Sequence, residues 1–106
     1  MAEFALPGCR LAPAGARIQR ERYARLAASV TSAGRAPLVL TVSFGADLDE
    51  RLLEETLAIE RECCPFLALE HDRAARRLVV RVADPALDVA LDALAEALAP
   101  PATLRA

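Results

Sequence analysis

The chain has 106 residues, a net charge of −2 and an apolar fraction of 55%. This length and apolar content suit one folded domain, which we expect to span residues 1–106. The small negative charge gives no reason to expect binding to nucleic acid or to a membrane surface, and no apolar run is long enough to cross a membrane. The N-terminus also lacks the apolar segment of a signal peptide, so the sequence predicts a cytoplasmic protein.

Residues 1–15 contain prolines and glycines and predict an irregular N-terminal arm, which leaves residues 16–99 as the expected folded core. A helix is predicted over residues 17–32, because apolar side chains recur there at helical spacing. Gly34 follows it and is a suitable residue to end a helix.

Residues 38–44 predict the first strand, because apolar residues alternate with smaller or polar ones. A second helix follows, for which Asp47 is the expected N-cap, and Glu50 completes a capping-box pattern. Apolar positions repeat with the period of a helix as far as Cys64, and the proline after it disfavours helix at that residue. This helix is therefore expected to end at about Cys64.

Residues 66–72 and 78–82 predict two further strands, and the short connection between them predicts an antiparallel hairpin. Asp84 and Pro85 then have the preferences of an N-cap and of the first position of a helix. A last helix is therefore expected to begin at Pro85 and to be stopped by Pro100 and Pro101.

The order helix–strand–helix–strand–strand–helix predicts an α+β fold. A strand–helix–strand crossover is right-handed and leaves its two strands parallel, so the strand over 78–82 can insert between them, antiparallel to both. The expected result is a three-stranded mixed sheet in the split β-α-β arrangement of a truncated ferredoxin-like fold, with an extra N-terminal helix. Because such a sheet has open edges, pairing with a second copy as a homodimer is also expected.

The candidate functional residues gather at the end of the second predicted helix. Cys63 and Cys64 are adjacent, and Glu60 lies within one helical turn of both, where the pattern asks for an apolar residue. Neighbouring cysteines rarely pair, since their Cα atoms are only about 3.8 Å apart. Their thiolates can instead converge on a soft ion such as zinc or mercury(II). Cys9 is the available third thiol, and Glu60 could bind the ion or take up thiol protons.

Other interpretations of the same residues stay open. A buried cysteine often serves as a small apolar side chain, and Glu60 could pair with an arginine, which would leave a structural dimerisation module. The thiols could also serve an enzyme or a redox switch acting on an organomercurial or a disulfide. The sequence has no CxxC zinc signature and indicates no organic cofactor. The one histidine, His71, is about 20 Å along a strand from Cys64 and is not expected to be a ligand.

The E-x-x-C-C-P-F segment at residues 60–66, with Cys9 upstream, resembles a group of small uncharacterised bacterial proteins. Similar segments are appended to the C-terminus of some MerR-type regulators in a heavy-metal-resistance setting. The resemblance extends from about residue 9 to residue 98, and it implies a thiophilic-metal role as a sensor, a buffer or a delivery module. This chain differs from the group in its short region after the first helix, which has one predicted strand where relatives have room for a hairpin. These 106 residues also predict no DNA-binding portion.

Overall fold

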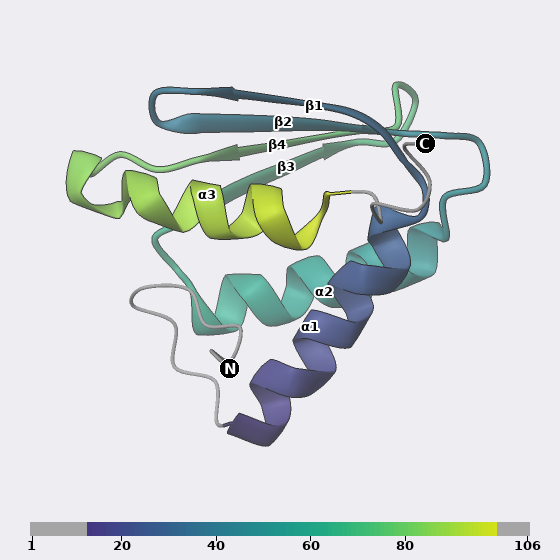
Figure 1. Ribbon diagram of the computed structural model, residues 1–106, viewed down its shortest axis with the longest axis horizontal. Coiled ribbons are helices and arrows are strands. Elements are labelled where there is room, and N and C mark those ends of the chain that lie inside the picture. Colours follow the sequence, from purple (N-terminus) through teal and green to yellow (C-terminus); the bar gives the residue numbers. More distant parts are fainter. Residues whose placement is uncertain (1–12, 100–106) are drawn as a thin grey trace.

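The computed structural model describes residues 13–99, which form a four-stranded sheet with all three α helices on one side of it (Figure 1). In chain order the elements are α1 (Pro13–Ala27), β1 (Val30–Ala36), β2 (Val39–Phe44), α2 (Glu50–Cys63), β3 (Ala68–Asp72), β4 (Arg77–Arg81), the 3-10 helix η1 (Pro85–Leu87) and α3 (Asp88–Ala97). The α+β class predicted from the sequence is confirmed. Within this part of the chain, no helix is both long enough and apolar enough to cross a membrane.

The sheet has the strand order β1-β2-β4-β3, and every neighbouring pair is antiparallel. The prediction of three strands in a mixed sheet is therefore wrong, since the sheet has four strands and its pairings are all antiparallel. The central place predicted for the strand over 78–82 is confirmed, because β4 lies between β2 and β3. α2 connects β2 to β3, which completes the split β-α-β unit. β1 lies beside β2, where a complete β-α-β-β-α-β sheet would have its last strand.

The strand missing from the prediction is β1. The helix expected over residues 17–32 instead spans Pro13–Ala27, and Gly34 lies within β1 instead of ending a helix. Val30 and Thr31 begin the strand, and their β-branched side chains fit a pleated sheet better than a helix. Antiparallel pairing with β2 then supplies the backbone partners that a further helical turn would have supplied.

The start of α2 also differs from the prediction. Its N-cap is Asp49, whose Oδ1 atom accepts a hydrogen bond from the backbone N–H of Leu52 (3.0 Å), and the expected cap, Asp47, lies two residues earlier. Leu48, between the two aspartates, is buried in the core, so the turn after β2 continues past it before the helix begins. Either aspartate could cap a helix, and the burial of Leu48 decides between them.

Two further predictions concern the two ends of the core. Asp84 is a cap as predicted: its Oδ1 atom accepts from the backbone N–H of Ala86 (2.9 Å) at the start of η1, which leads directly into α3. The predicted arm over residues 1–15 lies mostly outside the described residues, and its last three residues are the first residues of α1.

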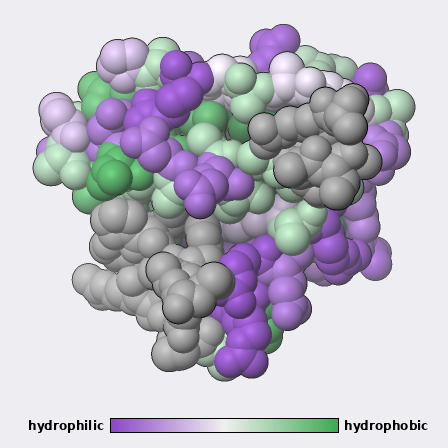
Figure 2. All heavy atoms as spheres, viewed as in Figure 1, coloured by the Kyte–Doolittle hydropathy of each residue, from purple (hydrophilic) through white to green (hydrophobic). Residues whose placement is uncertain are grey.

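The core lies between the sheet and the helices, and every α helix contributes to it. Its largest fully buried apolar side chains are Tyr23, Leu26, Leu40, Val42, Leu53, Leu57, Leu78, Leu91, Leu94 and Leu98. Hydrophilic side chains gather over α1 on the face shown in Figure 2. One side of α1 therefore faces the core and the other faces solvent, as the amphipathic pattern requires.

Candidate functional site

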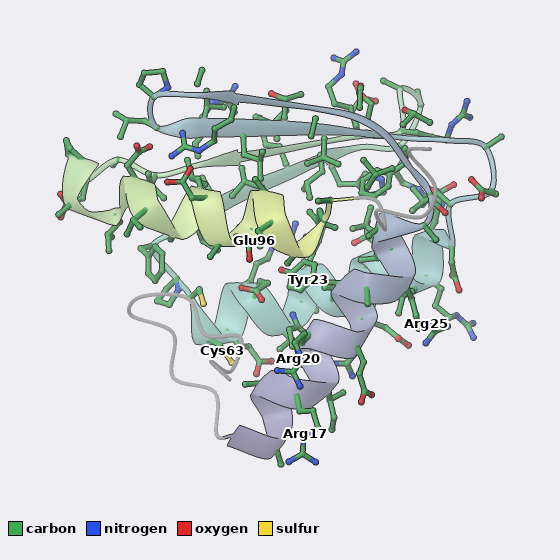
Figure 3. All side chains as sticks on the ribbon, viewed as in Figure 1. Arg17, Arg20, Tyr23, Arg25, Cys63 and Glu96 are labelled. Atoms are coloured by element: carbon green, nitrogen blue, oxygen red, sulfur yellow. The ribbon has the colours of Figure 1, made fainter. Side chains whose placement is uncertain are left out.

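The predicted end of α2 is confirmed, and it brings Glu60, Cys63 and Cys64 into one helical turn. Cys63 is the last helical residue and Cys64 is the C-cap, whose backbone N–H donates to the carbonyl of Glu60 (2.7 Å). Figure 3 shows Cys63 at this end of α2. Cys63 is half-buried and packs against the core, whereas Cys64 is fully buried within it. One thiol is thus partly accessible, and the other is held in the core.

Glu60 is fully buried, at 0% exposure, on the face of α2 that packs against α1. One of its carboxylate oxygens, Oε1, accepts a hydrogen bond from Nε2 of Gln19 on α1 (3.0 Å). The other oxygen, Oε2, is also buried and has no hydrogen-bond partner among the described residues. Burying a polar atom without a partner is unfavourable, so this oxygen calls for an explanation.

Gln19 is a residue of this site that the sequence interpretation missed. It is fully buried, and besides its bond to Glu60 its Nε2 atom donates to the backbone carbonyl of Thr56 (2.9 Å). Its Oε1 atom accepts from Nη1 of Arg22 (2.9 Å). The signal that could have revealed Gln19 is its spacing of four residues from Tyr23 on the buried face of α1, because a polar side chain on an apolar face needs a polar partner across it.

The arginine that could have neutralised Glu60 does not reach it. Arg22 bonds to the amide oxygen of Gln19, and in residues 13–99 no ion pair involves the Glu60 carboxylate. The interpretation that Glu60 simply pairs with an arginine is therefore not what this part of the chain shows. Its carboxylate is held there by a neutral amide.

The two thiols and the carboxylate do not by themselves make a complete metal site. Among residues 13–99, no three His, Cys, Asp or Glu side chains are grouped closely enough to hold a metal ion. Cys9, the third thiol expected from the sequence, lies outside the described residues. A shell of three or more protein donors would therefore need a donor from outside this range, or a rearrangement of side chains within it.

His71 lies elsewhere in the fold. Its side chain is nearly buried, at 3% exposure, and its Nδ1 atom is 2.6 Å from Oε2 of Glu54, in the N-terminal half of α2. Glu54 precedes Cys63 by nine residues, a rise of about 14 Å along a helix. The structure thus places His71 away from the cysteines, as the sequence spacing predicted.

A shallow pocket of about 420 Å³ also lies away from the cysteines, at β3 and β4, and is lined by Glu70, His71, Asp72, Arg77 and Val79.

No protein-family model, curated protein or solved structure matches the chain. The resemblance to the E-x-x-C-C-P-F proteins therefore stays a prediction.

Proposed function

We propose that this protein binds a soft metal ion, such as zinc or mercury(II), through the thiolates of Cys63 and Cys64. Glu60 assists, and Cys9 completes the set of donors. The observation that carries this proposal is the buried Glu60 carboxylate, which lies one helical turn before two adjacent thiols and has one oxygen without a partner among the described residues. A metal ion would supply the positive charge that no arginine of residues 13–99 supplies.

The donor chemistry suits a thiophilic ion. Thiolates favour soft and borderline ions, and a carboxylate oxygen can either complete the shell of a zinc ion or accept hydrogen bonds beside it. Cys64 is fixed by the core around it, whereas Cys63 is partly accessible. An ion would therefore approach from the side of Cys63.

Cys9 is proposed as the third thiolate because the described residues offer no third donor grouped with the two cysteines. Bringing Cys9 to Cys63 closes a loop of some fifty residues, and the entropy of loop closure grows only with the logarithm of loop length. The ordering cost is a few kcal/mol, whereas binding of a structural zinc ion supplies on the order of 10 kcal/mol. The balance therefore favours recruitment of Cys9.

A structural role for the cysteines is the second candidate, and one observation favours it. Cys64 is fully buried in the apolar core, where a thiol can act simply as a small apolar side chain. In that case the protein would bind no metal ion with useful affinity, and the cysteines would contribute only to packing.

Metal stoichiometry separates the two candidates. Native mass spectrometry of the full reduced chain, with zinc and then mercury(II) added, is expected to show one bound ion per chain. Cys63→Ser and Cys9→Ser should each weaken binding of that ion strongly, because each removes a thiolate. Cys9→Ser should also abolish metal-dependent protection of the N-terminal segment from proteolysis. If the wild type binds neither ion, the structural role is correct. If Cys9→Ser binds as tightly as the wild type, Cys9 is not a ligand.

A further inference from the structure

We infer that Gln19 is a positioning residue of the proposed metal site, which acts by fixing the orientation of the Glu60 carboxylate. This inference rests on the proposed function. It is carried by a chain of three hydrogen bonds from Arg22 through Gln19 to Thr56 and Glu60, which links α1 to the end of α2.

The orientation of the Gln19 amide follows from its partners at both ends. An arginine side chain can only donate hydrogen bonds, so the atom of Gln19 that faces Arg22 must be the amide oxygen. The amide nitrogen then faces α2, where two acceptors lie at hydrogen-bond distance: the carbonyl of Thr56 at 2.9 Å and Oε1 of Glu60 at 3.0 Å. A flipped amide would place an oxygen against two acceptors and a nitrogen against a donor, so the contacts allow one orientation.

This orientation determines which oxygen of Glu60 is left for the site. The Gln19 amide nitrogen has two hydrogens, and its two acceptors use both of them. Gln19 therefore holds Oε1 and has no hydrogen left for Oε2, which is buried and without a hydrogen-bond partner in residues 13–99. The carboxylate cannot rotate without losing its bond to Gln19. Oε2 is consequently the oxygen that a bound ion, or a group ordered by the ion, would contact.

The arrangement also explains why Arg22 acts through an amide. A guanidinium in direct contact with Glu60 would neutralise the carboxylate and weaken its attraction for a cation. Because Gln19 stands between them, Arg22 orients the amide without pairing with the Glu60 carboxylate. Removing a group that orients a metal ligand through a hydrogen bond, without touching the metal itself, typically lowers metal affinity 10- to 100-fold.

A double-mutant cycle on the full reduced chain tests this inference. Zinc affinity is measured by competition with a chromophoric chelator for the wild type, Gln19→Leu, Glu60→Gln and the double variant. Gln19→Leu is expected to weaken zinc binding about 10- to 100-fold in the wild-type background and less than about twofold in the Glu60→Gln background. Such non-additivity is expected only if Gln19 acts through Glu60. The unfolding midpoint without metal reports any general loss of stability separately.

Two further variants keep the test decisive if Gln19→Leu folds poorly. Arg22→Leu releases the amide without removing it and should weaken zinc binding, although less than Gln19→Leu does. Arg25→Leu is the matched control, because Arg25 is exposed on α1 and points away from Cys63 (Figure 3). The zinc affinity of this variant should equal that of the wild type. Equal losses from Gln19→Leu in both backgrounds, or equal affinity of Arg22→Leu and the wild type, would overturn the inference and leave the proposed function standing. A wild type that binds neither zinc nor mercury(II) would overturn the proposed function and the inference with it.

Discussion

At the scale of single residues, Glu60 has opposite effects on stability and on binding. Its carboxylate is fully buried beside a neutral amide, and a buried charge without a cation destabilises the metal-free protein. Glu60→Gln keeps an oxygen that can accept from Gln19 and removes the charge. We expect it to raise the free energy of unfolding of the metal-free protein by about 1 kcal/mol and to weaken metal binding.

Chemical denaturation with chelator present measures the first effect, and metal titration measures the second. A stabilised variant with unchanged metal affinity would show that Glu60 has no part in the site. A clearly destabilised variant would instead show that the metal-free protein depends on the charge of this carboxylate.

The backbone of Arg76 has a strained conformation. It lies in the loop between β3 and β4 with a φ of 51°, a left-handed conformation in which a side chain costs about 1–2 kcal/mol relative to glycine. Its side chain is exposed, so little packing is lost on its removal. After allowing for the greater flexibility of glycine in the unfolded chain, Arg76→Gly should raise the free energy of unfolding by about 0.5–1 kcal/mol.

Arg77→Gly is the natural control for this prediction. Arg77 is also an exposed arginine, but it lies in β4 and is paired with Ser43, where glycine weakens a strand. Urea denaturation should therefore show opposite signs for the two variants. Destabilisation of both by the same amount would mean that the left-handed φ of Arg76 is not a source of strain.

At the scale of elements, a polar cluster of Arg35, Asp88 and Asp92 connects the β1–β2 hairpin to α3. Oδ1 of Asp88 lies 2.9 Å from Nη2 of Arg35 and accepts from the backbone N–H of Leu38 (2.8 Å), and Asp92 also contacts Arg35 (3.0 Å). Leu38 follows Pro37 in the two-residue loop and has a φ of 66°. The cluster thus holds a loop residue in a conformation that side chains rarely adopt.

This cluster predicts a contribution to acid sensitivity. The hydrogen bond from Arg35, and then that from the Leu38 N–H, lower the pKa of Asp88 below its ordinary value of 3.8. A carboxyl group whose pKa is lowered by folding stabilises the protein above its unfolded-state pKa, and this contribution is lost as the pH falls through the folded-state pKa. Asp88→Asn should therefore be less stable than the wild type at neutral pH, and the difference should shrink below about pH 4.

Thermal unfolding of both proteins between pH 7 and pH 3 measures this difference. Asp92→Asn is a useful comparison, because Asp92 contacts the same arginine but makes no bond to the hairpin backbone, and its effect should be smaller. A difference between wild type and Asp88→Asn that stays constant over this range would contradict the prediction.

The elements that could be predicted are those whose pattern is local. β2 and β4 show alternation because one of their faces packs on the core, and α2 ends where proline follows Cys64. β1 shows no such pattern, because most of its side chains are small and exposed. It becomes a strand by pairing with β2, and that pairing is a tertiary interaction that periodicity does not report.

The candidate site could likewise be predicted only in the part whose pattern is local. Helical spacing was sufficient to place Glu60 in the same turn as Cys63 and the C-cap Cys64, at the C-terminal end of α2. Gln19 could not be assigned to Glu60 in advance, because the two residues are 41 positions apart and meet only through the packing of α1 on α2. Spacing along one element is readable in a sequence, whereas contacts across elements depend on how those elements pack.

At the scale of the whole molecule, the two edges of the sheet differ in their protection against other strands. The β3 edge carries the carboxylates of Glu70 and Asp72, and Arg61 of α2 reaches the backbone carbonyl of Leu69 (3.4 Å). The β1 edge carries only small uncharged side chains from residue 31 to residue 34, and Arg35 is turned toward α3. Charged side chains and covered backbone are the usual protection of an edge strand, so β1 is the edge open to pairing.

We therefore expect the homodimer predicted from the sequence to form by antiparallel pairing of β1 with β1 of a second copy, which would give a continuous eight-stranded sheet. A side chain can be added at Gly34 without disturbing the monomer, because a Cβ atom there would meet nothing within 4 Å. Gly34→Lys should block the pairing by placing two like charges close together across the twofold axis.

Light scattering after size exclusion should give twice 11.3 kDa for the wild type and a single-chain mass for Gly34→Lys. Ala68→Lys also introduces a lysine at a sheet edge, the exposed β3 edge, and should leave the dimer intact. A wild type that stays monomeric at tens of micromolar, or a dimer lost only in Ala68→Lys, would place any self-association elsewhere than β1.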